Sequence, residues 1–128
     1  MTHYSLLITH YCRRAVCGLA LVGICVLLAC DVEPHKTDAE LGLNAQQVHG
    51  RRVWEQRCQE CHFAYIPGNL HGPTMQGIFK KQFLPSGTPA NDERVRDVIN
   101  LGRSKMPSFG RVLTAEQVDD LIAYLHTL

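Results

Sequence analysis

The chain has 128 residues, which is enough for one domain of modest size. Its charge is nearly balanced, with 13 Lys and Arg residues against 12 Asp and Glu residues, and basic residues cluster only in pairs such as Arg51-Arg52 and Lys80-Lys81. We expect these pairs to be solvated surface. Proteins that neutralise nucleic-acid phosphates usually carry a marked basic excess, so the composition argues against a nucleic-acid partner.

The first thirty residues differ from the rest of the chain. Arg13 and Arg14 precede an uncharged apolar run from Ala15 to Cys30. A positive segment followed by a short apolar stretch is typical of an export signal, and the run is shorter than the roughly 20 residues of a membrane-spanning helix. We predict a signal peptide over residues 1–29, with a retained N-terminal anchor as the alternative.

The apolar run ends in LLAC, Leu27 to Cys30, which resembles a bacterial lipobox. In a lipobox the cysteine becomes the lipid-modified first residue, and several acyl chains together anchor a protein stably to a membrane. We therefore expect acylation of Cys30, with an ordinary cleavage site as the alternative. The polar, aperiodic segment that follows predicts a tether over residues 30–43 and a folded domain over residues 44–128.

The first expected helix begins near Asn44, a plausible N-cap, and runs into a cysteine motif. Gly50 and Trp54 are four residues apart and so lie on one helical face. A glycine inside a helix costs about 1 kcal/mol relative to alanine, so it usually marks close packing against another element. We expect Trp54 to pack against the C-terminal helix near Leu121 and Tyr124.

Two more helices are expected, which makes the domain all-α. The middle one is capped by Asn91 and ends at Gly102, and the last one begins at Thr114 with Gln117 completing a capping box. Residues 63–90, between the first and middle helices, are rich in proline and glycine and show no strand alternation. A linker of this length in a small domain suggests that it wraps a ligand.

The motif Cys58-Gln59-Glu60-Cys61-His62 holds the last two cysteines of the chain, because the other four belong to the signal or the lipobox. A redox dithiol would need a helix N-terminus inside a βαβ unit, whereas this pair follows a helix. Structural zinc would need two further ligands, and neither a later cysteine nor an H-x₃₋₅-H pair supplies them. Both interpretations are disfavoured.

Covalent haem uses every residue of this motif. Two thiols three positions apart bind the two vinyl groups of one haem, and the adjacent His62 becomes an axial ligand of the iron. A folded part of about 85 residues is also short for a self-sufficient core, and a covalent cofactor stabilises it. We predict one haem c on Cys58 and Cys61, with His62 as an iron ligand.

Residues 44–128 resemble the class I (monohaem) c-type cytochromes, which have three main helices around one haem. The resemblance also rests on Gly50-x-x-x-Trp54, NLHGPTMQGIFKK, SKMPSFG and LTAEQVDDLIAYL. In this family the methionine of M-P-x-F binds the iron opposite the histidine, and a carbonyl at the position of Pro73 accepts a hydrogen bond from the histidine. The resemblance thus implies Met106 as the second axial ligand and Pro73 as the partner of His62.

Met75 and His71 are the competing ligands; we expect Met75 to fill the core and His71 to lie in a surface loop. The resemblance implies a protein that is no enzyme and has no catalytic residues, and that passes single electrons between redox proteins at the periplasmic side of a bacterial membrane. Two alternatives are a haem subunit fixed in a larger oxidase or dehydrogenase complex, and a haem peroxidase or gas sensor with an open coordination position.

Overall fold

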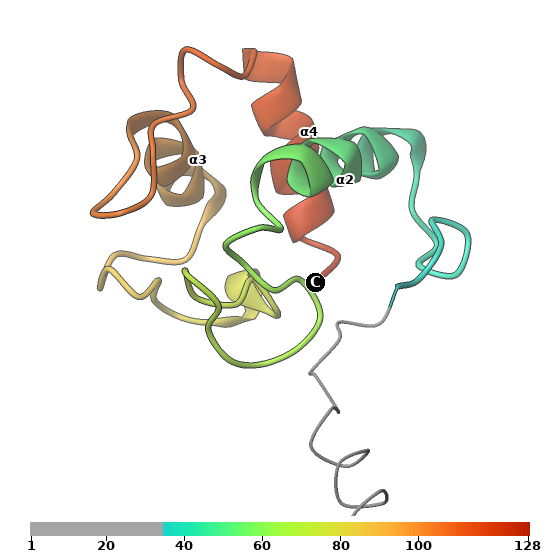
Figure 1. Cartoon of the computed structure of the whole chain (residues 1–128), viewed down its shortest axis with the longest axis horizontal. Helices are drawn as coiled ribbons and strands as arrows, with labels where there is room; N and C mark the ends of the chain where they lie inside the picture. The colour runs from blue at the N-terminus through green and yellow to red at the C-terminus, as the bar shows by residue number, and fades with distance from the viewer. Residues whose placement is uncertain (1–34) are drawn as a thin grey trace, which may run out of the picture. The chain divides into compact units, whose positions relative to one another are not determined.

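The computed structural model describes residues 35–128. Their regular elements are the helices α2 (Ala45–Arg57), α3 (Asp92–Leu101) and α4 (Ala115–Leu125) and the short 3₁₀-helix η1 (Ile78–Lys80) (Figure 1). Within this range β pairing is limited to isolated bridges. The predicted all-α fold with three main helices is confirmed. The predicted signal peptide and Cys30 lie outside the described residues.

Each α-helix begins at its predicted N-cap. The side chains of Asn44, Asn91 and Thr114 each accept a hydrogen bond from the backbone N–H three residues later. At Asn44 and Thr114 a glutamine side chain returns the bond to the cap, which completes a capping box. These bonds satisfy N–H groups that the first helical turn leaves unpaired, so local sequence determines where the helices start.

Helix α4 is the centre of the core. Its buried side chains are Val118, Leu121, Ile122, Tyr124 and Leu125. Both α2 and α3 contact α4, and Figure 1 shows α2 crossing it. Val53 and Trp54 of α2 and Val95 and Ile99 of α3 complete the helical part of the core.

The α2–α4 crossing depends on Gly50. A Cβ atom at this position would lie 1.9 Å from the carbonyl oxygen of Asp120 in α4. One turn later, Trp54 is 3% exposed and its ring centroid lies 6.2 Å from that of Tyr124. The expected close approach at Gly50 and the expected packing of Trp54 on the last helix are both present.

The described part of the expected tether folds into a turn. The N–H groups of Leu41 and Leu43 donate to the carbonyls of Thr37 and Asp38, each at 3.1 Å. Leu43 packs against the core. The domain boundary at residue 44 stays a prediction, but the chain is hydrogen-bonded before that residue.

Candidate functional site

The cysteine motif lies where α2 ends. Cys58 is the C-cap residue, and its N–H donates to the carbonyl of Trp54 at 2.8 Å. The N–H groups of Cys61 and His62 both donate to the carbonyl of Cys58 at 3.0 Å, which closes a tight turn. Both cysteines are free thiols, with Cys61 exposed and Cys58 partly buried. The turn therefore presents two thiols and one imidazole from a single short segment.

The ring of His62 is fixed from several sides. Its Nδ1 lies 2.7 Å from the carbonyl oxygen of Pro73, and because a carbonyl only accepts, Nδ1 is the donor. In the neutral imidazole this arrangement leaves the lone pair on Nε2, the form in which imidazole binds a metal. The indole of Trp54 lies against the same ring, with centroids 6.3 Å apart. A Cβ at Gly72 would lie 2.3 Å from Cε1, so only glycine lets this loop approach the imidazole.

The loop that carries Pro73 is tied back to the cysteine motif. The N–H groups of His71 and Gly72 donate to the carbonyl of Cys61, at 3.2 and 2.7 Å. A bridge between Asn69 and Pro73 closes the loop on itself. Since its backbone is bonded to the same turn that carries His62, the Pro73 carbonyl is held in position for the imidazole.

The pKa of the Cys58 thiol does not favour a redox dithiol. Burial, with a smaller contribution from Cys61, raises the pKa of Cys58 to about 12. Redox dithiols instead depend on a lowered thiol pKa, because the thiolate is the nucleophile. In residues 35–128 no group of three or more His, Cys, Asp or Glu side chains could hold a metal ion, so zinc also lacks a ligand set there.

Met106 lies on a tight turn that follows α3. Arg103 and Met106 exchange two backbone hydrogen bonds, of 3.0 and 2.8 Å, and Ser104 between them has a φ of 53°. Gly102 has a φ of 74°, and a Cβ there would lie 2.7 Å from the carbonyl oxygen of Met106. The Met106 side chain is half-buried against the core. Its backbone position is thus determined by the turn and by the glycine beside it.

The competing ligands lie as expected, with Met75 packed against the core and His71 exposed. The attachment roles of Cys58 and Cys61 and the ligand roles of His62 and Met106 stay predictions.

The expectation that the Arg51-Arg52 pair is solvated is wrong for Arg51, which is 7% exposed. Its salt bridge to Glu55, four residues later, is the one signal that the local sequence offered.

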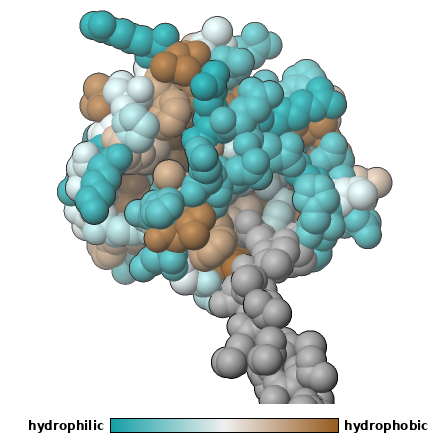
Figure 2. Space-filling model, viewed as in Figure 1, coloured by the Kyte–Doolittle hydropathy of each residue, from teal (hydrophilic) through white to brown (hydrophobic). Residues whose placement is uncertain are grey.

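These residues fit a covalently attached, apolar, planar cofactor. The turn after α2 supplies two thiols and a ring nitrogen with a free lone pair, and Met106 supplies a thioether sulfur. Leu70 and Leu101, which adjoin the loops of Pro73 and Met106, are 45% and 76% exposed. Figure 2 shows apolar spots scattered over a largely polar face. Large apolar side chains exposed close in sequence to Pro73 and Met106 are what an apolar cofactor bound there would cover.

None of the helices in residues 35–128 is long and apolar enough to cross a membrane.

Comparison with known proteins agrees with this site. Residues 45–125 match the family model described as cytochrome c oxidase, cbb3-type, subunit III. A cytochrome c6 of Rippkaea orientalis is 32% identical over 76 residues, which cover 59% of this chain and 65% of the relative. A cytochrome c6 of a Nostoc species is 25% identical over 112 residues, which cover 88% of this chain and 91% of the relative. The chain thus spans just under two thirds of the first relative and most of the second.

The matched segment contains the cysteine motif, both expected ligands and the three α-helices found in residues 35–128. Cytochrome c domains bind one covalent haem c, and cytochromes c are electron carriers and not enzymes, so the predicted cofactor and the predicted lack of catalysis agree with the family. The chain belongs to the cytochrome c family, in the group represented by subunit III of cbb3-type cytochrome c oxidase.

Proposed function

We propose that this protein is a monohaem cytochrome c with His62 and Met106 as axial ligands, which passes single electrons between redox proteins at the periplasmic face of a bacterial membrane. The observation that carries the proposal is the 2.7 Å hydrogen bond from His62 Nδ1 to Pro73, with Gly72 against the same ring. A histidine whose one nitrogen is bonded to a carbonyl and whose other nitrogen keeps its lone pair is arranged as a metal ligand.

When bound, haem supplies the one-electron chemistry of iron. Cys58 and Cys61 would hold it covalently. The Pro73 carbonyl orients the His62 imidazole and increases its basicity, and the indole of Trp54 lies beside that ring. Met106 offers a thioether, and Met/His ligation raises the reduction potential of haem iron. Because His62 and Met106 would both bind the iron, neither oxygen nor peroxide would find an open position, which disfavours the peroxidase and gas-sensor alternatives.

The attachment to the membrane is proposed from the LLAC sequence that ends at Cys30. Removal of the signal with Arg13 and Arg14 leaves 11 Lys and Arg residues against 12 Asp and Glu residues, so net charge does not select a partner. The match to an oxidase subunit favours one second candidate, a haem subunit fixed in a larger complex. Purification as a monomer that still exchanges electrons with a soluble protein would exclude that candidate.

The ligand set is tested by Met106→Ala, with Met75→Ala as the matched control. We expect Met106→Ala to abolish the weak band at the near-infrared edge that marks methionine bound to Fe(III) haem, and to lower the potential. Met75→Ala should keep the band, because Met75 packs against the core. Persistence of the band in Met106→Ala would place the ligand elsewhere.

The intact mass of the native protein tests the remaining parts. We expect one haem, cleavage before Cys30 and an acyl mass on the new N-terminus. Cys58→Ser or Cys61→Ser should reduce or abolish covalent haem on a denaturing gel, and unchanged haem staining contradicts the attachment site. Cys30→Ala should release the protein from membranes.

A further inference from the structure

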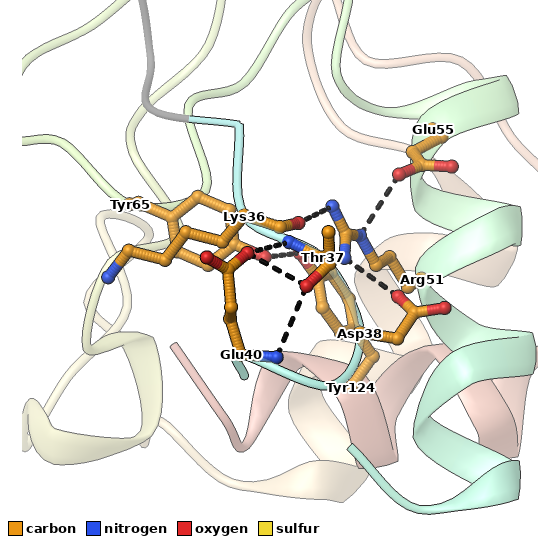
Figure 3. A network of polar contacts seen from close by, with 8 residues as sticks. All are labelled: Lys36, Thr37, Asp38, Glu40, Arg51, Glu55, Tyr65 and Tyr124. Carbon is orange, nitrogen blue, oxygen red and sulfur yellow. Dashed lines mark hydrogen bonds and ion pairs between the residues drawn. The ribbon is translucent and has the colours of Figure 1, made fainter. Parts of the chain in front are cut away.

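Arg51 joins α2 to the chain that precedes it. Arg51 is 7% exposed, and every nitrogen of its guanidinium donates a hydrogen bond. Nη1 donates to Asp38 Oδ1 at 2.7 Å and Nη2 to the Lys36 carbonyl at 2.6 Å, while Nε donates to Glu55 Oε1 at 3.0 Å (Figure 3). Glu55 lies one turn further along the same helix. Asp38 and Lys36 belong to the segment expected to be a tether, so one buried cation ties that segment to the domain.

The segment has its own folded structure. Thr37 and Glu40 bond reciprocally: the Thr37 N–H and hydroxyl donate to Glu40 Oε2 at 2.7 and 2.8 Å, and the Glu40 N–H donates to the Thr37 hydroxyl at 3.3 Å. The hydrogen bonds from Thr37 lower the pKa of Glu40. The turn then ends in Leu43, whose side chain packs against the core. We call residues 36–43 the strap.

The chain just before the strap lies near Trp54, whose ring packs near His62. A cavity of about 140 Å³ lies beside it, and its lining includes His35, Arg51, Trp54 and Tyr124. The ring of Trp54 also lies 6.3 Å from that of His62, measured between centroids. The hydroxyls of Tyr65 and Tyr124 lie 2.5 Å apart next to this cavity (Figure 3).

The charges explain why the strap stays docked. Burial by itself would lower the pKa of Arg51, but the hydrogen bond with Asp38 and the electrostatic interactions with Tyr65, Glu55 and Asp38 outweigh it, so the pKa is raised. If the strap leaves, the guanidinium meets water and keeps only Glu55 as a partner, so undocking costs the charge-assisted hydrogen bonds to Asp38 and to the Lys36 carbonyl. The strap therefore leaves α2 only when this cost is met.

We propose that Arg51 is a clamp that makes the strap part of the folded domain, so that a chain anchored at Cys30 holds its haem domain on a leash of five residues, 31–35. The leash rests on the lipid anchor proposed above; the clamp does not. Five extended residues span at most about 18 Å, whereas thirteen, 31–43, would span about 47 Å. The clamp thus keeps the haem domain close to the lipid surface, where its redox partners, membrane-bound or soluble, must come to dock.

The clamp is tested by hydrogen exchange on the full-length haem protein. The readout is the backbone amides of Leu41 and Leu43, which the strap protects. In Asp38→Ala we expect these amides to exchange about tenfold faster, which corresponds to a loss of about 1.4 kcal/mol in the free energy of opening. We expect the same increase in Arg51→Ala, provided that its haem spectrum shows a folded domain. Arg52→Ala, an exposed neighbour on the same helix, is the control. Equal protection in Asp38→Ala and Arg52→Ala overturns the clamp.

The leash is tested with vesicles of phosphatidylethanolamine and phosphatidylglycerol that carry a headgroup fluorophore. Haem quenches the fluorophore more strongly at shorter distance, so we expect vesicle-bound wild-type protein to quench more than vesicle-bound Asp38→Ala. Equal quenching by the two overturns the leash. If the wild type does not bind vesicles, or Cys30→Ala binds equally well, the anchor and the leash fail together, and hydrogen exchange still decides the clamp.

Discussion

Replacement of Gly50 by alanine tests the helix crossing that places Trp54 and, through it, His62. At an exposed helical position this change stabilises a protein by about 1 kcal/mol. Here the new Cβ would lie 1.9 Å from the carbonyl oxygen of Asp120 and 2.4 Å from its carbonyl carbon. Carbon and carbonyl oxygen normally approach no closer than about 3.3 Å. Both clashing atoms are backbone, so no side-chain rotation relieves the overlap and α2 must move away from α4.

The expected loss of stability follows from the packing at the α2–α4 interface that this movement would disturb. Trp54, Val118 and Leu121 are each at most 3% exposed at this interface, and displaced helices would loosen their packing. Overpacking a core costs typically 1–3 kcal/mol, and we take roughly 3 kcal/mol because both partners are backbone. The helix propensity of alanine offsets about 1 kcal/mol of this. We expect a net loss of roughly 2 kcal/mol, which lowers the Tm of a domain of this size by about 8–16 °C.

The assay is thermal and guanidinium unfolding of the mature haem protein, followed by the fluorescence of Trp54, the only tryptophan. Arg52→Ala, exposed on the same helix, is the control and should change stability by less than about 0.5 kcal/mol. If Gly50→Ala raises the Tm, as at an ordinary helical position, the close crossing of α2 and α4 is wrong.

Two further predictions concern the packing around His62. In Gly72→Ala the new Cβ would lie 2.3 Å from His62 Cε1, so we expect a displaced imidazole, an altered haem spectrum and a shifted reduction potential. The free energy of unfolding should fall by about 1–3 kcal/mol. The control, His71→Ala at an exposed position, should leave the spectrum unchanged, and identical spectra for the two variants refute the contact. Burial and the hydrogen bond with Tyr65 raise the pKa of Tyr124, so the folded protein holds this proton more tightly than the unfolded chain does. The contribution of Tyr124 to the free energy of unfolding should therefore be constant below about pH 10 and fall above it by about 1.4 kcal/mol per pH unit. Tyr124→Phe should remove that slope, and a slope that persists in this variant belongs to another group.

The helices could be predicted because their signals are local. Asn44 and Thr114 each stand three residues before the glutamine that completes a capping box, and Gly102 ends α3 at a positive φ. The cysteine motif is equally local, since its chemistry needs only adjacent residues. Met106 and Pro73 came from a family resemblance, and the structure adds the 2.7 Å bond that ties Pro73 to His62.

The role of Arg51 could not be predicted, because its partners come from a segment without periodicity. Asp38 lies thirteen residues before Arg51, in a polar stretch that has the composition of a linker. An arginine beside another arginine on a helix also has the pattern of a solvated face, and only the fold shows that one of the pair is buried. The bond between Tyr65 and Tyr124, 59 residues apart, is likewise a product of the tertiary structure.

The two expected iron ligands are held in different ways. Long-range contacts fix His62: the Pro73 loop bonds its Nδ1, and Trp54 joins its ring to Tyr124 of α4. The backbone of Met106 is held by its own neighbours, through two bonds to Arg103 and the close approach of Gly102. Gly50 lets α2 pack closely on α4, and Arg51, the next residue, binds the strap. Both contacts lie within one turn of Trp54, the residue of α2 that packs near His62. The same helix that ends in the cysteine motif therefore joins the cofactor site, the core and the segment that leads toward Cys30.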